Sequence, residues 1–209
     1  MTASGDPRNI VKTIACVPAD YRKPIRMVIN DYDFDVVARN IILLLVAHTS
    51  EDLLSAAESM LHIWYSGLVR PSDLTLLNQN VRPLIEDVVR KIAEKPGHAL
   101  QAKTWTFGKS SSVRVILTTS EWTKLLAYFE VPPGLTGEKA RKIRTSVTLA
   151  FERRDYVDRG MLLVPQGERV CAMRFRENGL LLPFGHSTAE FTVPNPYVVR
   201  KATSCVSQC

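Results

Sequence analysis

The chain begins with a glycine turn, which is followed by a helix and then by a strand that ends in acidic residues. The turn is Ser4-Gly5-Asp6-Pro7, and the strand is residues 25–29, closed by Asn30-Asp31. Nucleotide-binding α/β folds build their pockets in this order. Such a fold also needs a buried strand before the glycine, and only residues 1–4 precede it here. The pattern therefore indicates a cofactor-binding ancestry more clearly than a present activity.

The candidate site consists of the glycine turn and the acids that follow the strand. Gly5 allows a ligand to approach the backbone, and a helix from Pro7 to Cys16 presents free N–H groups to an anion. Asp31 or Asp33 stands where such folds hold ribose hydroxyls. The simpler alternative is helix capping, by Asp6 for the first helix and by Asp33 or Asp35 for the next. One glycine is also far from the full G-x-G-x-x-G pattern.

Length and composition are typical of a globular chain with a full core. The 209 residues are 45% hydrophobic and 23% charged, which fits one domain over residues 1–198 with a flexible tail over 199–209. The start is polar, unlike a signal peptide, and the longest apolar run, residues 41–47, is too short to span a bilayer. We therefore expect no membrane association and a cytoplasmic or nuclear location.

Periodicity and turn residues predict an α/β chain with extra helices and a C-terminal β-hairpin region. Residues 51–65 should present Leu53, Leu54, Ala57, Leu61 and Trp64 on one apolar stripe. The other predicted helices are residues 34–47, 73–95 with a kink at Pro83, 120–129 and 137–154. The predicted strands are residues 104–107, 113–117, 161–164, 170–175 and 180–182, with a hairpin turn at Asn178-Gly179.

The positive charge is concentrated in one stretch. Residues 139–176 hold ten basic and four acidic residues, which accounts for the whole net charge of +6. A basic face attracts nucleic acid or another acidic partner. The stretch lacks interleaved aromatic residues and glycine-rich loops, which favours a solvated helix face with internal ion pairs.

Other reactive residue types do not assemble into a known motif. Cys16, Cys171, Cys205 and Cys209 are scattered and are expected to be reduced thiols, and no second close ligand pair supports a metal site. Gly108-Lys109-Ser110 predicts a hairpin loop, because Lys103 stands where a phosphate loop requires glycine. His186-Ser187 lacks a nucleophile elbow. We expect His62 to be a core or edge histidine and Asp155, Asp158 and Arg159 to form an ion-pair cap.

Several segments carry a resemblance to a known family. They are residues 3–14, 29–33, 37–45, 61–66, 178–185, Phe191 and 194–196. They resemble an uncharacterised fungal family, domain of unknown function 4470, whose members often accompany a MYND-type zinc finger. The family is similar to the N-terminal part of an axonemal dynein assembly factor.

This resemblance implies a Rossmann-like fold, a degenerate relative of class I S-adenosylmethionine-dependent methyltransferases. It places Gly5 and Asp6 at the cofactor turn and Asp31 or Asp33 near the ribose. The chain departs from the family pattern because it lacks both a hydrophobic strand before the turn and a MYND finger. Two alternatives follow: the chain is a fragment, or another segment, such as one from a partner chain, fills the gap.

Three functional hypotheses remain. The first is a non-catalytic methyltransferase-like module that holds no cofactor and acts through protein–protein contacts or self-association, in an assembly or scaffold role. The second is an S-adenosylmethionine-dependent methyltransferase, in which the Gly5 turn holds the methionine end, Asp31 or Asp33 the ribose, and Trp64 or Tyr65 lies near the adenine. The third is a basic nucleic-acid-binding domain.

Overall fold

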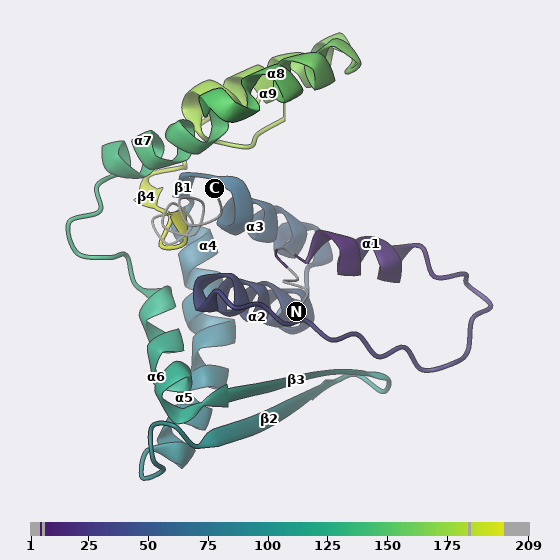
Figure 1. The fold of residues 1–209 in the computed structure, drawn as a ribbon, viewed down its shortest axis with the longest axis vertical. Coiled ribbons are helices and arrows are strands. Elements are labelled where there is room, and N and C mark those ends of the chain that lie inside the picture. Colours follow the sequence, from purple (N-terminus) through teal and green to yellow (C-terminus); the bar gives the residue numbers. More distant parts are fainter. Residues whose placement is uncertain (1–4, 6, 184, 199–209) are drawn as a thin grey trace.

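The structure is a computed structural model that describes residues 5, 7–183 and 185–198 (Figure 1). Helix makes up 56% of the described residues, and the described strands form two antiparallel pairs. One pair joins β2 (Leu100–Phe107) to β3 (Ser111–Thr118), and the other joins β1 (Leu68–Val69) to β4 (Val193–Pro194). The mixed α/β class is confirmed, whereas the described residues contain no parallel sheet of the Rossmann type.

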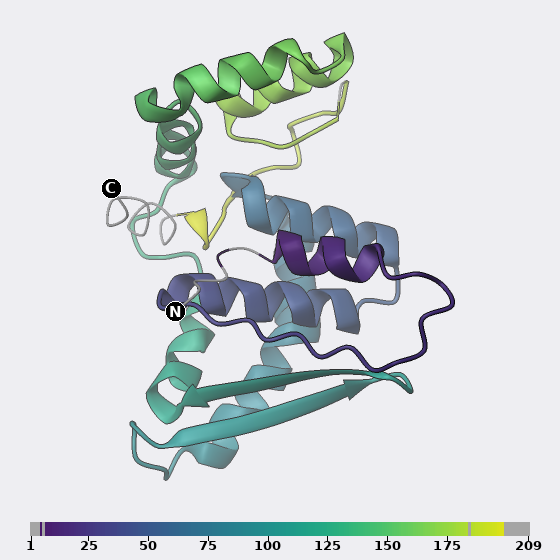
Figure 2. The same ribbon diagram turned by 45° about the vertical axis from the view of Figure 1, so that its right-hand side comes forward.

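The central element is α2 (Phe34–Thr49), which lies between the helix that follows it in the chain and the β2–β3 hairpin (Figures 1 and 2). Its long apolar run predicts burial on most sides, and the side chains from Ala38 to Leu43 are all buried. The helix begins at Asp33, whose carboxylate accepts a hydrogen bond from the Asp35 N–H. The predicted cap is therefore confirmed for Asp33.

The neighbouring helix, α3 (Leu53–Tyr65), is confirmed, but its predicted apolar stripe is wrong except at Trp64. Leu53, Leu54 and Leu61 are exposed, and the opposite face, with Ser59 and His62, is buried instead. This buried face also holds Ala56 and Ile63, and its two polar members have hydrogen-bond partners there. The Ser59 hydroxyl donates to the Asp73 carboxylate at 2.7 Å.

A long helical rod follows, made of α4 (Pro71–Leu76), the π-helical turn η1 (Leu77–Val81) and α5 (Arg82–Ile92). The predicted kink at Pro83 appears as this π turn, which ends just before the proline. Proline has no N–H to donate and its ring crowds the preceding turn, so the regular pattern changes there. Contacts between α5 and α6 (Thr119–Leu126) then close the main core around Trp122 and Leu125.

The β2–β3 hairpin confirms the two predicted strands and the loop between them. Gly108 has a φ of 58°, in the left-handed region that the turn requires. One face of the hairpin packs on the core through Trp105, Val115 and Leu117. The phosphate-loop interpretation of residues 108–110 stays rejected, because a second strand follows the loop instead of a helix.

The C-terminal third differs most from the prediction. The basic helix expected over residues 137–154 is split into α7 (Gly137–Thr148) and α8 (Phe151–Leu162). The strands predicted at 161–164, 170–175 and 180–182 are wrong. Residues 161–164 hold the end of α8 and a turn, residues 166–178 form the helix α9 (Gln166–Asn178), and residues 180–182 belong to no ladder. Gly179 ends α9 with a φ of 69°. Asn-Gly serves both hairpin turns and helix ends, since both need a positive φ, and here the helix end forms.

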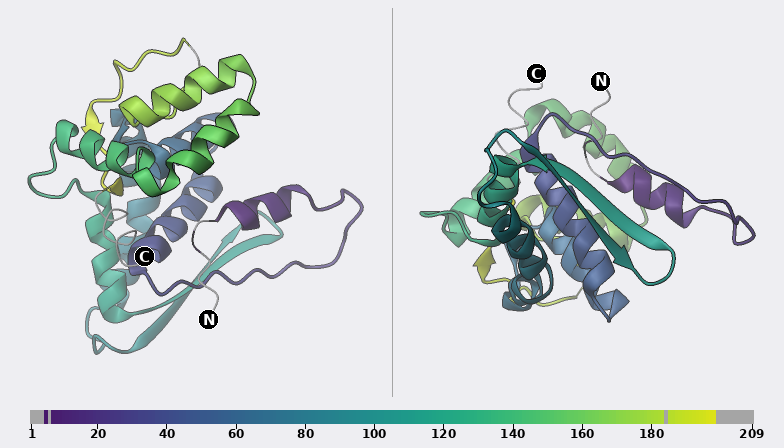
Figure 3. Two further views of the ribbon diagram at one scale, coloured as in Figure 1. Left: turned by 45° about the horizontal axis from the view of Figure 1, so that its top comes forward. Right: turned by 90° about the horizontal axis from the view of Figure 1, so that it is seen from below.

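A second, smaller core connects these helices to the rest. Leu68, Ala140, Leu180, Phe191 and Val198 pack together there. Backbone hydrogen bonds run from Gly67 N–H to Gly179 O at 2.7 Å and from Asn195 N–H to Gly67 O at 3.0 Å. Helices α8 and α9 lie at one end of the molecule, and the β2–β3 hairpin lies at the other (Figures 1 and 3).

The N-terminal part forms one helix and a long irregular connection. Helix α1 (Arg8–Ala15) confirms the predicted helix, with Pro7 at the N-cap. The strand predicted over residues 25–29 is wrong, because this segment belongs to no ladder. It runs within an arm that loops out beyond α1 and returns beneath it (Figures 1 and 3). A strand forms only when another strand pairs with it, and no described strand pairs with this arm.

Candidate functional site

The structure brings together the two halves of the predicted site. The Gly5 N–H donates to Oδ2 of Asp31 at 2.8 Å, across 26 residues of sequence. Gly5 has a φ of 56°, so the turn uses the conformational freedom of glycine. Asp6 lies outside the described residues. The pairing of the glycine turn with Asp31 is thus a real feature of the fold.

Both oxygens of the Asp31 carboxylate accept hydrogen bonds from the chain's own backbone. Oδ2 accepts from Gly5, and Oδ1 accepts from the Asp33 N–H at 3.0 Å. Asp33 in turn accepts from the Asp35 N–H at 2.8 Å and begins α2. The acids expected near a ribose therefore hold the entry to α2 in place.

Asn40 completes this arrangement from the buried helix α2. Its Nδ2 donates to the Gly5 carbonyl oxygen at 2.8 Å, and its side chain is almost fully buried. In the described part of the chain, its Oδ1 has no hydrogen-bond partner. We refer to Gly5, Asp31, Asp33 and Asn40 as the N-terminal clasp.

Sequence reasoning missed Asn40, although a signal for it was present. Arg39-Asn40 is the one polar interruption in the apolar run of α2. A polar pair inside a helix that is buried on most sides needs partners there. That requirement points to a contact with another backbone segment, which is the Gly5 turn.

Trp64 and Tyr65 were expected near an adenine. Their rings stack on one another at 5.0 Å, at the end of α3. Trp64 is buried within the main core, and Tyr65 packs against that core. The structure gives these rings a packing role.

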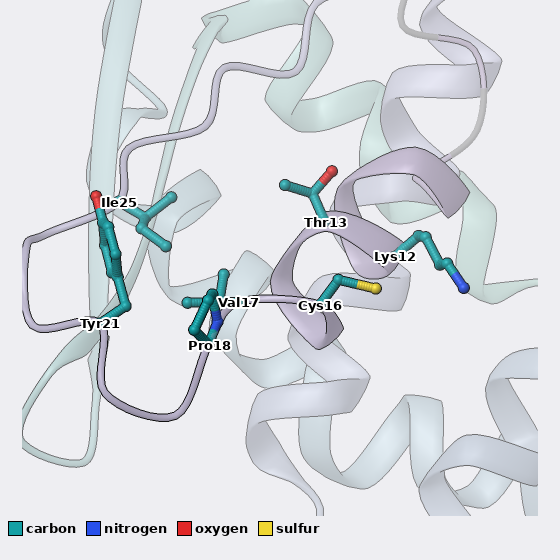
Figure 4. Close-up of a pocket in the computed structure, with 7 residues that line it drawn as sticks. All are labelled: Lys12, Thr13, Cys16, Val17, Pro18, Tyr21 and Ile25. Carbon is teal, nitrogen blue, oxygen red and sulfur yellow. The ribbon is translucent and has the colours of Figure 1, made fainter.

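A cavity of about 440 Å³ opens beside the C-terminal end of α1 (Figure 4). It lies between α1 and the arm that follows, and Lys12, Cys16, Tyr21 and Ile25 are among its lining residues. Figure 4 shows Tyr21 and Ile25 on one side of the space and Cys16 and Thr13 on the other. Gly5, Asp31 and Asp33 do not line it.

The remaining reactive residues have structural environments. His62 is buried against Phe191, as predicted for a core histidine, and this burial lowers its pKa. Burial also lowers the pKa of His48, whose ring stacks on Phe107 at 4.6 Å. His186 and Ser187 are both exposed. The described residues contain no cluster of three or more potential metal ligands, and Cys205 and Cys209 lie outside them.

The basic stretch is spread over α7, α8 and α9 and contains ion pairs. Lys142 pairs with Glu138 at 2.7 Å, Arg159 with Asp155 at 3.6 Å, and Arg176 with Asp158 at 2.7 Å. Arg144 is buried over the ring of Phe175. Internal pairing of this kind is what the solvated-face interpretation predicts.

Among the described helices, none is long and apolar enough to cross a membrane.

The clasp can be tested by stability. Asp31→Ala is expected to lower the free energy of unfolding by about 1–2 kcal/mol, because the N–H groups of Gly5 and Asp33 lose their acceptor. Urea denaturation followed by circular dichroism measures the change. Tyr32→Ala is the matched control, since the Tyr32 side chain is fully exposed and its loss should leave stability unchanged. Equal stability of Asp31→Ala and the parent chain would show that the clasp contributes nothing.

Comparison with known proteins gives one match. Residues 1–69 match the family described as Domain of unknown function (DUF4470). The matched segment contains the clasp together with α1, α2 and α3. No curated protein and no solved structure matches the chain.

Proposed function

We propose that this chain is a non-catalytic module that acts through protein–protein contacts, in an assembly or scaffold role. The observation that carries the proposal is the hydrogen bonding of the Asp31 carboxylate. Both of its oxygens are engaged by the chain's own N–H groups. A carboxylate that holds a ribose accepts hydrogen bonds from the hydroxyls of the ligand, whereas Asp31 uses one bond on each oxygen to join two segments of its own chain.

The residues of the clasp therefore fit S-adenosylmethionine poorly. A ribose at Asp31 would have to share oxygens that each already accept one backbone N–H and that hold the Gly5 turn to the entry of α2. Asp33 is committed to the first turn of α2 in the same way. We derive no catalytic step through this cofactor.

The exposed stripe on α3 supports a role in protein contacts. Leu53 and Leu54 are 72% and 81% exposed, and Leu61 lies further along the same helix at 44%. Apolar helix faces usually pack against the core, and contiguous apolar surface outside the core marks interaction sites. The stripe lies within the segment that the family match covers.

The alternative is an S-adenosylmethionine-dependent methyltransferase, and one observation favours it. Beside the glycine turn, the Asn40 Oδ1 atom is a buried acceptor that has no partner among the residues that the structure describes. A buried acceptor of this kind is costly unless a donor reaches it. An ammonium or hydroxyl group of a ligand would supply such a donor.

Titration calorimetry with S-adenosylmethionine separates the two hypotheses. We expect no binding heat from the parent chain at ligand concentrations up to the millimolar range. Micromolar binding that disappears in the Asp31→Ala/Asp33→Ala double variant would establish the methyltransferase alternative. Micromolar binding that the double variant retains would contradict both the non-catalytic proposal and the assignment of these two residues.

A further inference from the structure

We propose that α1 and the arm, residues 17–30, form a docking surface for an extended acidic segment of a partner protein. The segment would pair with residues 23–29 as an added strand and place an apolar side chain in the cavity beside α1. This inference rests on the proposed function and deepens it, because it names a surface and the chemistry of its partner.

The first observation is the unpaired backbone of the arm. Within the described part of the chain, no hydrogen bond involves the backbone of residues 23–29. The sequence there, Lys-Pro-Ile-Arg-Met-Val-Ile, is rich in residues that favour strands. A row of free N–H and C=O groups is the template that strand addition uses.

The second observation is the apolar surface that surrounds this backbone. Val28 is 77% exposed, and Tyr21 and Ile25 are nearly half exposed. Helix α1 has no buried residue, and Val11 and Ile14 on its apolar side face solvent. The N-terminal helix and arm thus offer apolar contacts that the rest of the chain leaves uncovered.

The third observation is the cavity between these two elements. It has a volume of about 440 Å³ and is lined mainly by apolar groups of Val17, Pro18, Tyr21 and Ile25 (Figure 4). Such a space accepts a single large side chain from a chain segment that runs along the arm. Anchor side chains that fill a pocket supply most of the affinity at many interfaces.

Charge identifies the occupant as acidic. Residues 7–30 carry five basic residues, Arg8, Lys12, Arg22, Lys23 and Arg26, against Asp20 alone. All five are exposed. A second copy of this chain would bring the same cations against this surface, which is unfavourable across paired strands. Aspartate and glutamate in the added strand complement these cations instead.

A peptide selection tests the proposal on the full chain. A random-peptide display library is panned on the immobilised protein, and the enriched sequences are synthesised and measured by fluorescence polarisation. We expect enriched peptides in which apolar residues alternate with Asp or Glu. The Ile25→Ser/Val28→Ser variant should bind them at least about tenfold more weakly. The matched control, Leu162→Ser/Leu163→Ser, removes two exposed leucines elsewhere on the chain and should leave binding unchanged.

A second measurement does not depend on any variant. Methylation of alternate backbone nitrogens in the selected peptide removes donors that an added strand needs and should abolish binding. Retained binding by the methylated peptide would overturn strand addition. Three results of the selection would overturn the docking surface: no enriched peptides, basic peptides, or peptides that bind the Ile25→Ser/Val28→Ser variant as well as the parent chain.

Two further outcomes overturn the choice of partner. Dimerisation detected by light scattering and lost in Ile25→Ser/Val28→Ser would make a second copy the occupant. Salt-sensitive binding of RNA that is lost in the same variant would make nucleic acid the occupant. The calorimetry described above is a separate test. Binding of S-adenosylmethionine in that calorimetry would contradict the non-catalytic proposal but would not affect the peptide result. Failure of the peptide selection alone would contradict only the docking surface on α1 and the arm.

Discussion

Asp73→Ala is expected to lower the free energy of unfolding by about 3–5 kcal/mol, because it leaves the Arg70 guanidinium with too few partners in a largely buried site. Asp73 is fully buried. Its carboxylate accepts from the Ser59 hydroxyl at 2.7 Å, from the Arg70 N–H at 2.8 Å and from the Arg70 guanidinium at 3.0 Å. The hydrogen bond from the Arg70 guanidinium to Asp73 raises the pKa of Arg70.

Guanidinium denaturation followed by tryptophan fluorescence measures this loss. Asp87→Ala is the matched control, since Asp87 forms its ion pairs with Arg90 and Lys91 on the exposed side of α5. We expect no measurable change for that control, because exposed pairs contribute little. A second variant, Arg70→Met/Asp73→Leu, removes both charges and should recover part of the lost stability. Failure of Asp73→Ala to destabilise more than Asp87→Ala would contradict a structural role for the buried pair.

The elements that sequence reasoning found best are those fixed by local pattern. The long apolar run of α2 allows few arrangements besides a buried helix. The alternation of residues around Gly108-Lys109-Ser110 predicts a hairpin, and the structure contains it. In both cases the information lies within a short stretch of sequence, so no distant partner is needed to read it.

The face that α3 buries was predicted wrongly for a physical reason. Hydrophobicity places Leu53, Leu54 and Leu61 inside, but the buried side includes Ser59 and His62. These polar side chains enter the core because Asp73 and Ser66 supply hydrogen bonds there. Such complementary pairs become visible only when segments distant in sequence are brought together.

The sequence predicts which residues belong to the candidate site, but it does not predict the hydrogen bonds among them. Gly5 and Asp31 were selected from an expected cofactor pocket, and the structure places them in direct contact. Sequence could not show that the acid would bond to the glycine N–H itself. The wrong strand prediction for residues 25–29 has a related cause. Whether these residues form a strand depends on a pairing partner and not on their own β-propensity.

Asn195→Ala is expected to lower the free energy of unfolding by about 2–4 kcal/mol, through loss of a cap at the end of α3. The Asn195 side-chain amide lies near three carbonyl oxygens of that helix end, His62 at 3.2 Å, Ile63 at 3.0 Å and Ser66 at 2.7 Å. Its Oδ1 accepts from the Tyr197 N–H at 2.9 Å. Removing the amide takes a donor from the buried carbonyl oxygens of Ile63 and Ser66, and each buried group that loses its hydrogen bond costs about 1–3 kcal/mol, whereas the His62 oxygen keeps the Ser66 N–H.

Asn195→Asp isolates the donor role of that amide. The carboxylate keeps the shape and the bond to Tyr197, but it cannot donate to the carbonyl oxygens and repels them. We therefore expect thermal unfolding to show Asn195→Asp at least as destabilised as Asn195→Ala, with the exposed Asn178→Ala as control. Stability of Asn195→Asp close to that of the parent chain would mean that side-chain volume, and not donation to α3, holds the C-terminal segment in place. The joint formed by Gly67, Gly179 and Asn195 would then depend on its backbone hydrogen bonds alone.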